Sequence, residues 1–321
     1  MRIGLTVDLQ TDATNERQAE FDPPRTIAAL RVALETLGHQ VVPLGNAHDV
    51  LRAPQRLRGI ELVFNLAEGT DSRCREAWAP TVCELHGVSY VGSDPLALML
   101  GLDKAMSKRL AQAAGILTPP WISIEHPSML PDDILFPVIV KPRYEGSGRG
   151  IDAEAVVSTR HALEERVGWL FTRCPEPMLI ETFIPEGELT VCVIGNDSPT
   201  AYPAIQRPLD PATRLSYHVI SQHPSAWIAP LTLTDDLDAE ARRIALAMFE
   251  TLGCRDMARV DLRVDAAGRV HFLEINPLPS FDPEGTFGLL AEYIGVRYHE
   301  LIGRILDSAL TRLKRAAIPS P

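Results

Sequence analysis

The sequence has no apolar run long enough to cross a membrane and no excess of positive charge. It contains 31 Lys and Arg against 42 Asp and Glu, a formal net charge of −11. This balance argues against non-specific binding to nucleic acid or to an anionic membrane. The opening stretch, MRIGLTVDLQ, is too short and carries charge too early for a signal peptide. We therefore expect a cytoplasmic protein without a nucleic-acid or membrane partner.

Cysteine is sparse, and its spacing excludes the common zinc motifs. The five cysteines form neither a CxxC pair nor a His-linked zinc spacing, and their number is odd. We expect buried free thiols rather than disulfides. The hydrophobic share of 45% and the charged share of 23% are those of an ordinary globular protein. The length of 321 residues allows two or three domains with their own cores.

Strands and helices alternate in the first third of the chain, which is typical of a parallel sheet covered by helices. The later part has the mixed pattern of a compact α+β unit, followed by long strands and two amphipathic helices. The expected strands are 2–9, 39–45, 61–68, 88–93, 119–124, 136–142, 177–184, 187–195 and 200–208. The expected helices are 23–38, 75–87, 94–115, 158–174, 238–253 and about 297–316.

The segment HFLEINPLPS places Glu274 and Asn276 two residues apart on an expected strand, so their side chains share a face. A proline follows at once and ends the strand. Upstream, Asp265–Gly268 is a candidate tight turn that brings Asp261 back near Glu274. The register stays open, because a bulge shifts the pairing by one residue. One register predicts an all-oxygen Mg²⁺ site, and the other predicts ordinary surface acids.

Three further segments could contact a nucleotide. In VIVKPRYEGSGRGI, Lys141 ends a buried strand before a loop whose glycines flank Ser147, and the N–H groups of such a loop can bind an anion. In LDKAMSKRL, Lys104 lies near a helix start, where phosphates bind. In LIETFIPEGELTV, Glu181 and Glu188 flank a turn whose backbone could pair with adenine. Each segment alone also fits a flexible turn, a solvated lysine or a charged connection.

The order of these motifs resembles that of the ATP-grasp superfamily, and within it the D-alanine–D-alanine ligase family. The resemblance extends over roughly residues 60–280 and includes YVGSDPLALMLGLDKAMSKRLAQAAGILTPPW, LGCRDMARVDLRVD and FLEINPLPS. It implies an α/β fold, α+β in parts, with an N-terminal parallel-sheet domain and ATP between the central and C-terminal domains. The expected domains are 1–95 for substrate, 96–184 as the central ATP-grasp unit and 185–321 as the C-terminal unit with the metal site.

The resemblance also implies roles for individual residues. Two lysines would contact the phosphates of ATP, the glycine-rich loop would cover them, and a hinge would hold the adenine and ribose. The residues implied at the nucleotide are Lys104, Lys141, Ser147, Glu181, Phe183, Ile184 and Glu188. The residues implied at two Mg²⁺ ions, with Mn²⁺ as an alternative, are Asp261, Glu274 and Asn276. The catalytic set implied is Arg259, which would stabilise the reacting carboxyl group, together with Lys141 and Ser147.

The function implied is an ATP-dependent carboxylate–amine ligase that joins amino-acid-like or peptide-like substrates through an acyl phosphate and forms ADP. Phosphoryl transfer needs mainly positioning and charge neutralisation, which lysines, Mg²⁺ and loop amides provide. Two alternatives stay open: a cyclising or carboxylating ATP-grasp enzyme, and a catalytically silent nucleotide-binding regulator. The resemblance is also compatible with a homodimer.

The chain departs from the family where substrates would be recognised. The stretch VDLQTDATNERQAEFDPPR lacks the Gly-rich motif whose Ser and Glu hold the first substrate's ammonium, and Glu16 and Glu20 are the candidates to replace it. The family's HG pattern appears as NLAEG, and the segment after the metal strand, PLPSFDPEGTFG, also differs. The loop over the site reads PATRLSYHVISQHPSAW, with Arg214 and Tyr217 as candidates. Another amino acid or a specialised small peptide is therefore at least as strong a candidate for the substrate as D-alanine.

Overall fold

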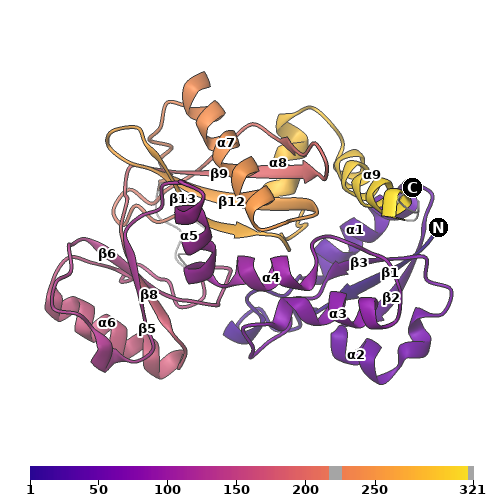
Figure 1. The fold of residues 1–321 in the computed structure, drawn as a ribbon, viewed down its shortest axis with the longest axis horizontal. Coiled ribbons are helices and arrows are strands. Elements are labelled where there is room, and N and C mark those ends of the chain that lie inside the picture. Colours follow the sequence, from indigo (N-terminus) through magenta and orange to yellow (C-terminus); the bar gives the residue numbers. More distant parts are fainter. Residues whose placement is uncertain (217–225, 317–321) are drawn as a thin grey trace.

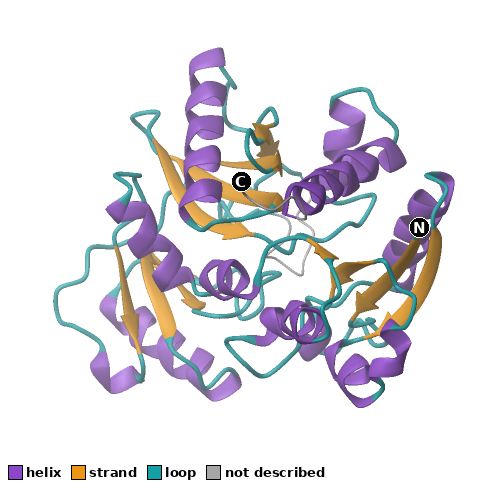
Figure 2. Cartoon of the chain, turned by 45° about the vertical axis from the view of Figure 1, so that its right-hand side comes forward, coloured by secondary structure: helices purple, strands orange, loops and turns teal. Residues whose placement is uncertain are grey.

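The structure is a computed structural model that describes residues 1–216 and 226–316. Its strands form three sheets, which lie side by side with helices around them (Figures 1 and 2). The first sheet is parallel, as predicted, in the order β2-β1-β3-β4. Its strands are β1 (Arg2–Val7), β2 (Gln40–Gly45), β3 (Leu62–Leu66) and β4 (Tyr90–Val91). Its helices are α1 (Pro24–Thr36), α2 (Ala47–Arg52) and α3 (Trp78–Leu85).

The second sheet is antiparallel, in the order β5-β8-β6-β7. Helix α6 (Arg160–Arg173) begins after Thr159, whose side chain accepts from the Ala162 N–H and caps the helix. Leu163, Val167 and Leu170 of α6 are fully buried in the same core as the sheet. The strands are β5 (Trp121–Ile124), β6 (Val138–Pro142), β7 (Val156–Val157) and β8 (Met178–Thr182).

The third sheet is also antiparallel, in the order β10-β9-β12-β13, with β11 paired to β9. The single strand expected at 200–208 is wrong, because Pro203 has no N–H for the ladder and two short strands form instead. Helix α7 (Asp235–Thr251) buries its apolar face on this sheet. The strands are β9 (Gly187–Gly195), β10 (Thr200–Ala201), β11 (Ile205–Arg207), β12 (Asp256–Val264) and β13 (Val270–Asn276).

The helix expected at 94–115 is two helices, α4 (Pro95–Leu102) and α5 (Lys104–Ala113), which meet at Asp103. Asp103 has an extended backbone, and its carboxylate accepts from the first N–H groups of α5. The same carboxylate forms a bidentate pair with Arg143 after β6, with both N···O distances 2.7 Å. The break therefore fixes the start of α5 against the second sheet.

The C-terminal helix α9 (Tyr298–Ala316) returns to the first sheet and packs against α1 (Figure 1). Leu30, Leu34, Leu301 and Ile305 share one buried core there. Sequence patterns did not predict α2 or the short helix α8 (Thr286–Tyr293) that precedes α9. The described residues also form four 3₁₀ turns: η1 (Glu16–Gln18), η2 (Pro54–Leu57), η3 (Arg75–Ala77) and η4 (Pro127–Met129).

All five cysteines are free thiols, as predicted, and four of them are buried. Burial raises the pKa of Cys83, Cys174, Cys192 and Cys254 to about 12, so these thiols stay protonated and unreactive near neutral pH. None of the helices in the described part of the chain is long and apolar enough to cross a bilayer.

Candidate active site

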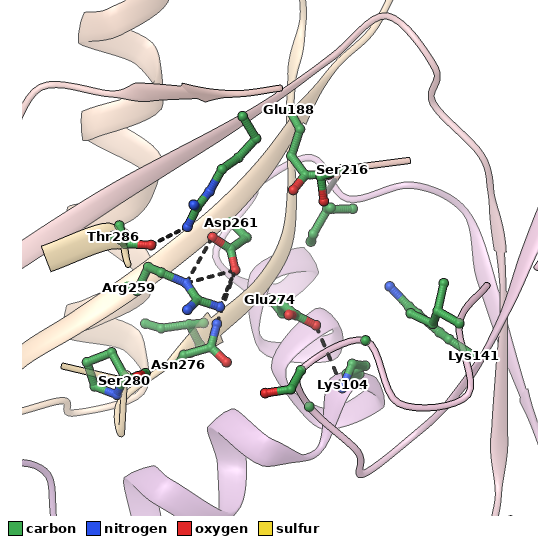
Figure 3. A pocket seen from close by; sticks show the side chains of 18 of the residues that line it. Lys104, Lys141, Glu188, Ser216, Arg259, Asp261, Glu274, Asn276, Ser280 and Thr286 are labelled. Atoms are coloured by element: carbon green, nitrogen blue, oxygen red, sulfur yellow. Dashed lines mark hydrogen bonds and ion pairs between the residues drawn. The ribbon is translucent and has the colours of Figure 1, made fainter. Parts of the chain in front are cut away.

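A cavity of about 580 Å³ lies among residues of the second sheet, the third sheet and the N-terminal unit. Every residue that the sequence resemblance implied at the nucleotide, the metals or the reacting carboxyl group lines this cavity. Figure 3 shows their side chains converging from α5, β6, β9, β12 and β13. The structure therefore brings together side chains that are far apart in the sequence.

The hairpin of β12 and β13 has the register that faces the acidic side chains toward one another. Asp261 pairs with Glu274 and Arg259 pairs with Asn276 across the two strands. A bulge between Asp261 and Leu262 shifts the register, which is the irregularity that the sequence left open. The turn between the strands is closed by Asp265, whose N–H donates to the Arg269 carbonyl and whose carboxylate accepts from two turn N–H groups.

Asp261 is held in place as a carboxylate by three neighbours. Arg259 donates to both of its oxygens at 2.8–3.2 Å, and Thr190 Oγ1 donates to Oδ1 at 2.5 Å. The Asn276 amide N–H donates to Oδ2 at 3.2 Å, and the amide oxygen points away from Asp261 (Figure 3). Burial alone would raise the pKa of Asp261, but the attraction of Arg259 and Arg207 outweighs it and holds the pKa below its usual value.

Lys104 joins the start of α5 to the hairpin and to the glycine-rich loop. Its Nζ lies 3.7 Å from Glu274 Oε2 and donates to the Glu145 carbonyl at 2.5 Å. The side chain is nearly buried, with 8% exposed. A single ammonium group thus connects the expected metal strand with the loop at 145–150.

Lys141 belongs to a buried charge cluster that sequence analysis described only in part. Glu181 lies between Lys108 Nζ at 2.7 Å and Lys141 Nζ at 3.5 Å. Burial lowers the pKa of Lys108 to about 8, while the two lysines outweigh burial at Glu181 and lower its pKa. Lys108 was missed, although it lies one helical turn after Lys104 and therefore on the same side of α5.

The expected adenine hinge at Glu181, Phe183 and Ile184 is also part of the cavity wall. The Phe183 N–H donates to the Pro137 carbonyl at 3.0 Å, and the Ile184 carbonyl accepts from Arg263 at 3.1 Å. Arg263 also binds Glu188 at 2.8 Å and lies over the Phe183 ring at 5.3 Å. Arg263 was missed, although the period of β12 places it on the same face as Arg259 and Asp261.

The glycine-rich loop contacts the N-terminal unit through Glu20. The Gly146 N–H donates to Glu20 Oε1, and the buried Arg75 binds Glu20 Oε2 at 2.5 Å. Arg75 also donates to the Tyr144 carbonyl at 2.8 Å. Of the two N-terminal candidates, Glu20 therefore lines the cavity, whereas Glu16 forms an exposed ion pair with Arg173.

Comparison with known proteins identifies the family to which this chain belongs. The family model described as "D-ala D-ala ligase C-terminus" matches residues 110–307. The chain is also 32% identical over 306 residues to a D-alanine--D-alanine ligase from Marinomonas sp., covering 88% of this chain and 89% of the relative. This chain belongs to the D-alanine–D-alanine ligase family.

Other matches agree with this family assignment. An uncharacterised protein from Sinorhizobium fredii is 32% identical over 87% of this chain and 86% of its own length. A crystal structure of D-alanine--D-alanine ligase from Bacillus anthracis complexed with ATP has the same fold, with a TM-score of 0.78 and 22% identity over 99% of this chain and 100% of that one. The chain therefore has the ATP-grasp fold of the D-alanine–D-alanine ligase family.

The structure places one of the two substrate-loop candidates, and that residue does not line the cavity. Arg214 is not among the residues that line it in the described part of the chain, and its carbonyl accepts from Arg263 at 3.0 Å. Tyr217 lies outside the residues that the structure describes.

Proposed function

We propose that this chain is an ATP-dependent carboxylate–amine ligase that joins amino-acid-like substrates and forms ADP. The observation that carries the proposal is the cavity, where lysines, a glycine-rich loop and facing acids of one hairpin converge. The relatives named D-alanine--D-alanine ligase and the neighbour solved with ATP support the same chemistry. The proposal includes no nucleic-acid partner. It places the protein in the cytoplasm, where ATP is abundant and thiols stay reduced.

In this proposal the chain has an N-terminal domain at 1–95 and two ATP-grasp domains at 96–184 and 185–321, with ATP between the last two. The phosphates would contact Lys104 and Lys141, whose ammonium groups both belong to the cavity. The adenine would lie against the apolar cluster that includes Ile139 and Phe183, and Glu188 would accept from the ribose hydroxyls. The Phe183 N–H already donates to the protein, so the ring and its neighbours would carry most of the adenine binding.

Asp261, Glu274 and Asn276 would hold two Mg²⁺ ions, or Mn²⁺ in their place. The donor set fits a hard cation, because two carboxylates and one amide come from paired positions of the same hairpin, and all three offer oxygen ligands. Such ions neutralise charge on the phosphates of ATP. The protein contributes by keeping Asp261 ionised through Arg259 and by holding Glu274 near Lys104.

The proposed reaction has two steps. A substrate carboxylate oxygen attacks the γ-phosphorus of ATP, which forms an acyl phosphate and releases ADP. An amine then attacks the acyl carbon, loses a proton, and the carbon–oxygen bond to phosphate breaks. Arg259 would stabilise the oxyanion of the second step, and its side chain is 24% exposed beside Asp261. No protein nucleophile is required.

The loop at 145–150 would act as the lid over the phosphates. Its tip, Ser147, is exposed and lines the cavity, and both Ser147 and Gly148 have positive φ angles, 48° and 71°. Glu20 and Lys104 hold the adjacent residues Gly146 and Glu145 against the rest of the site. A closed lid protects an acyl phosphate from water until the amine attacks.

The test is an amino-acid and dipeptide panel with ATP and Mg²⁺, followed by ADP assay and mass spectrometry of products. ADP formation with a new carbon–nitrogen bond supports the proposal. An ADP-forming reaction that gives no such bond with any amine would favour cyclising or carboxylating chemistry. Nucleotide binding without ADP release across the whole panel would favour a regulatory module.

A further inference from the structure

One part of the cavity holds more acidic side chains than the proposed nucleotide site needs. Glu20, Glu68 and Glu76 all line it, and they come from the N-terminal segment, the NLAEG stretch and η3. Arg75 pairs with Glu20, and both Arg75 and Lys104 act on Glu76. Burial and mutual repulsion raise the pKa of Glu76 to about 8 and that of Glu68 well above its usual range, although Arg75 lowers both.

Glu20 and Arg75 form an ion pair that uses much of the hydrogen-bonding capacity of both side chains. Arg75 binds Glu20 Oε2 at 2.5 Å, and the Gly146 N–H donates to the other oxygen of the same carboxylate. The Arg75 guanidinium is also shared with the Tyr144 carbonyl and lies 3.9 Å from Glu145. Its charge acts on Glu68 and Glu76 from a distance, but it forms no hydrogen bond or ion pair with either of them.

Glu76 is only 8% exposed, and it lines the cavity without a hydrogen-bond or ion-pair partner among residues 1–216 and 226–316. Glu68 likewise has no such partner within these described residues. A buried carboxylate without a partner is costly, so the buried Glu76, with the half-buried Glu68 beside the same cavity, is complementary to a cation that enters it.

The geometry favours an organic cation over a metal ion. Within the described chain, the one group of three potential metal ligands whose atoms converge within 4.8 Å is Glu145, Cys174 and Glu176. Glu20, Glu68 and Glu76 do not converge in this way. Their spread suits an ammonium or guanidinium group with donors that point in several directions.

We propose that Glu68 and Glu76 bind a second cationic group of the substrate, so that the enzyme prefers a basic amino acid, a diamine or a peptide with a basic side chain. The proposal rests on the ligase function above and names its substrate class. When a bound cation draws the protons off Glu68 and Glu76, the three carboxylates and the Arg75 guanidinium together have a net charge of −2. The α-ammonium of a neutral amino acid supplies one positive charge, whereas a basic amino acid supplies two.

The experiment compares substrates that are matched in shape but differ in charge: arginine against citrulline, and lysine against norleucine, each as D and L forms. The full-length protein is assayed with ATP and Mg²⁺ for ADP and for amide product. We expect kcat/KM to be at least about tenfold higher for the cationic member of a pair. Glu76→Gln should bring this ratio close to one by raising KM for the cationic substrate, with KM for ATP unchanged.

Glu84→Gln is the matched control, because Glu84 is exposed at the end of α3, where it accepts from the Tyr90 hydroxyl. Glu84→Gln should leave the preference for the cationic member of each substrate pair unchanged. Equal use of both members of each pair, with no effect of Glu76→Gln, overturns this inference but leaves the ligase function standing.

Calorimetry decides the question if no pair is turned over. Arginine and citrulline are titrated into wild type and Glu76→Gln in the presence of Mg²⁺ and a non-hydrolysable ATP analogue. Binding of arginine alone, lost in Glu76→Gln, supports the cation site even if the ligase function fails. Binding of neither compound, or of both equally, refutes it.

Discussion

Replacing Lys108 by methionine should destabilise the protein by about 3 kcal/mol, because it leaves Glu181 buried beside one weaker partner. Lys108 is fully buried, and its Nζ lies 2.7 Å from Glu181 Oε2 and 2.9 Å from Thr118 Oγ1. Breaking a buried ion pair by removing one partner costs about 3–5 kcal/mol. Lys141 remains at 3.5 Å from Glu181 and supplies part of the counter-charge, which favours the lower end of that range.

A double-mutant cycle separates the ion pair from simple packing. Glu181→Gln alone leaves Lys108 buried without its carboxylate and should cost a similar amount. The double variant Lys108→Met with Glu181→Gln removes both charges of the pair, so neither of them is left buried without the other. Its loss of unfolding free energy should therefore be about 2 kcal/mol smaller than the sum of the losses in the two single variants. Methionine nearly matches the length of lysine, so cavity formation contributes little.

The assay is urea unfolding of the nucleotide-free protein, followed by the fluorescence of its four tryptophans. A loss of less than about 1 kcal/mol in Lys108→Met, or strictly additive losses in the double variant, would refute the reasoning. The same variant should have a raised KM for ATP, because Glu181 would then draw the Lys141 ammonium toward itself and away from a phosphate.

Lys141→Ala and Glu274→Gln should each lower kcat more than about a hundredfold while circular dichroism stays native, because one removes the proposed phosphate contact and the other the proposed metal ligand. Near wild-type rates in either variant would contradict the site. Gly148→Val should slow ligation or increase wasteful ATP hydrolysis more than it lowers Tm, because Gly148 has a φ of 71° in the lid. Gly268→Val is its control, with a φ of 76° in the turn between β12 and β13. Trypsin cleavage at Arg149 should be suppressed by Mg²⁺ with a non-hydrolysable ATP analogue, and equal cleavage in both conditions would mean that this loop is not the lid.

The sequence predicted well what depends on local periodicity. The β12–β13 hairpin follows from alternating side chains and a turn, so Glu274 and Asn276 could be placed on one face. The register could not be predicted, because it depends on the bulge at Asp261 and on pairing with Thr190 of β9. A neighbouring strand from another part of the chain thus decides the geometry of the site.

Contacts between distant segments account for most of what sequence analysis missed. The Arg75–Glu20 pair joins residues 55 apart, and neither has a local pattern that points to the other. The break at Asp103 is similar, because the capping signal exists in the sequence but the pairing with Arg143 comes from the second sheet. The spacing of Lys108 to Lys104 was enough to predict that both lie on the same side of one helix. The sequence could not predict that Lys108 pairs with Glu181.

The central claim is that the enzyme activates a carboxylate as an acyl phosphate before an amine attacks. The most direct measurement supplies the carboxylate substrate labelled with ¹⁸O in both oxygens, together with ATP, Mg²⁺ and the amine, and analyses the released phosphate by mass spectrometry. An acyl phosphate intermediate should leave one ¹⁸O atom in each phosphate and one amide product for each ADP formed. Phosphate without ¹⁸O, released together with the amide product, would contradict it.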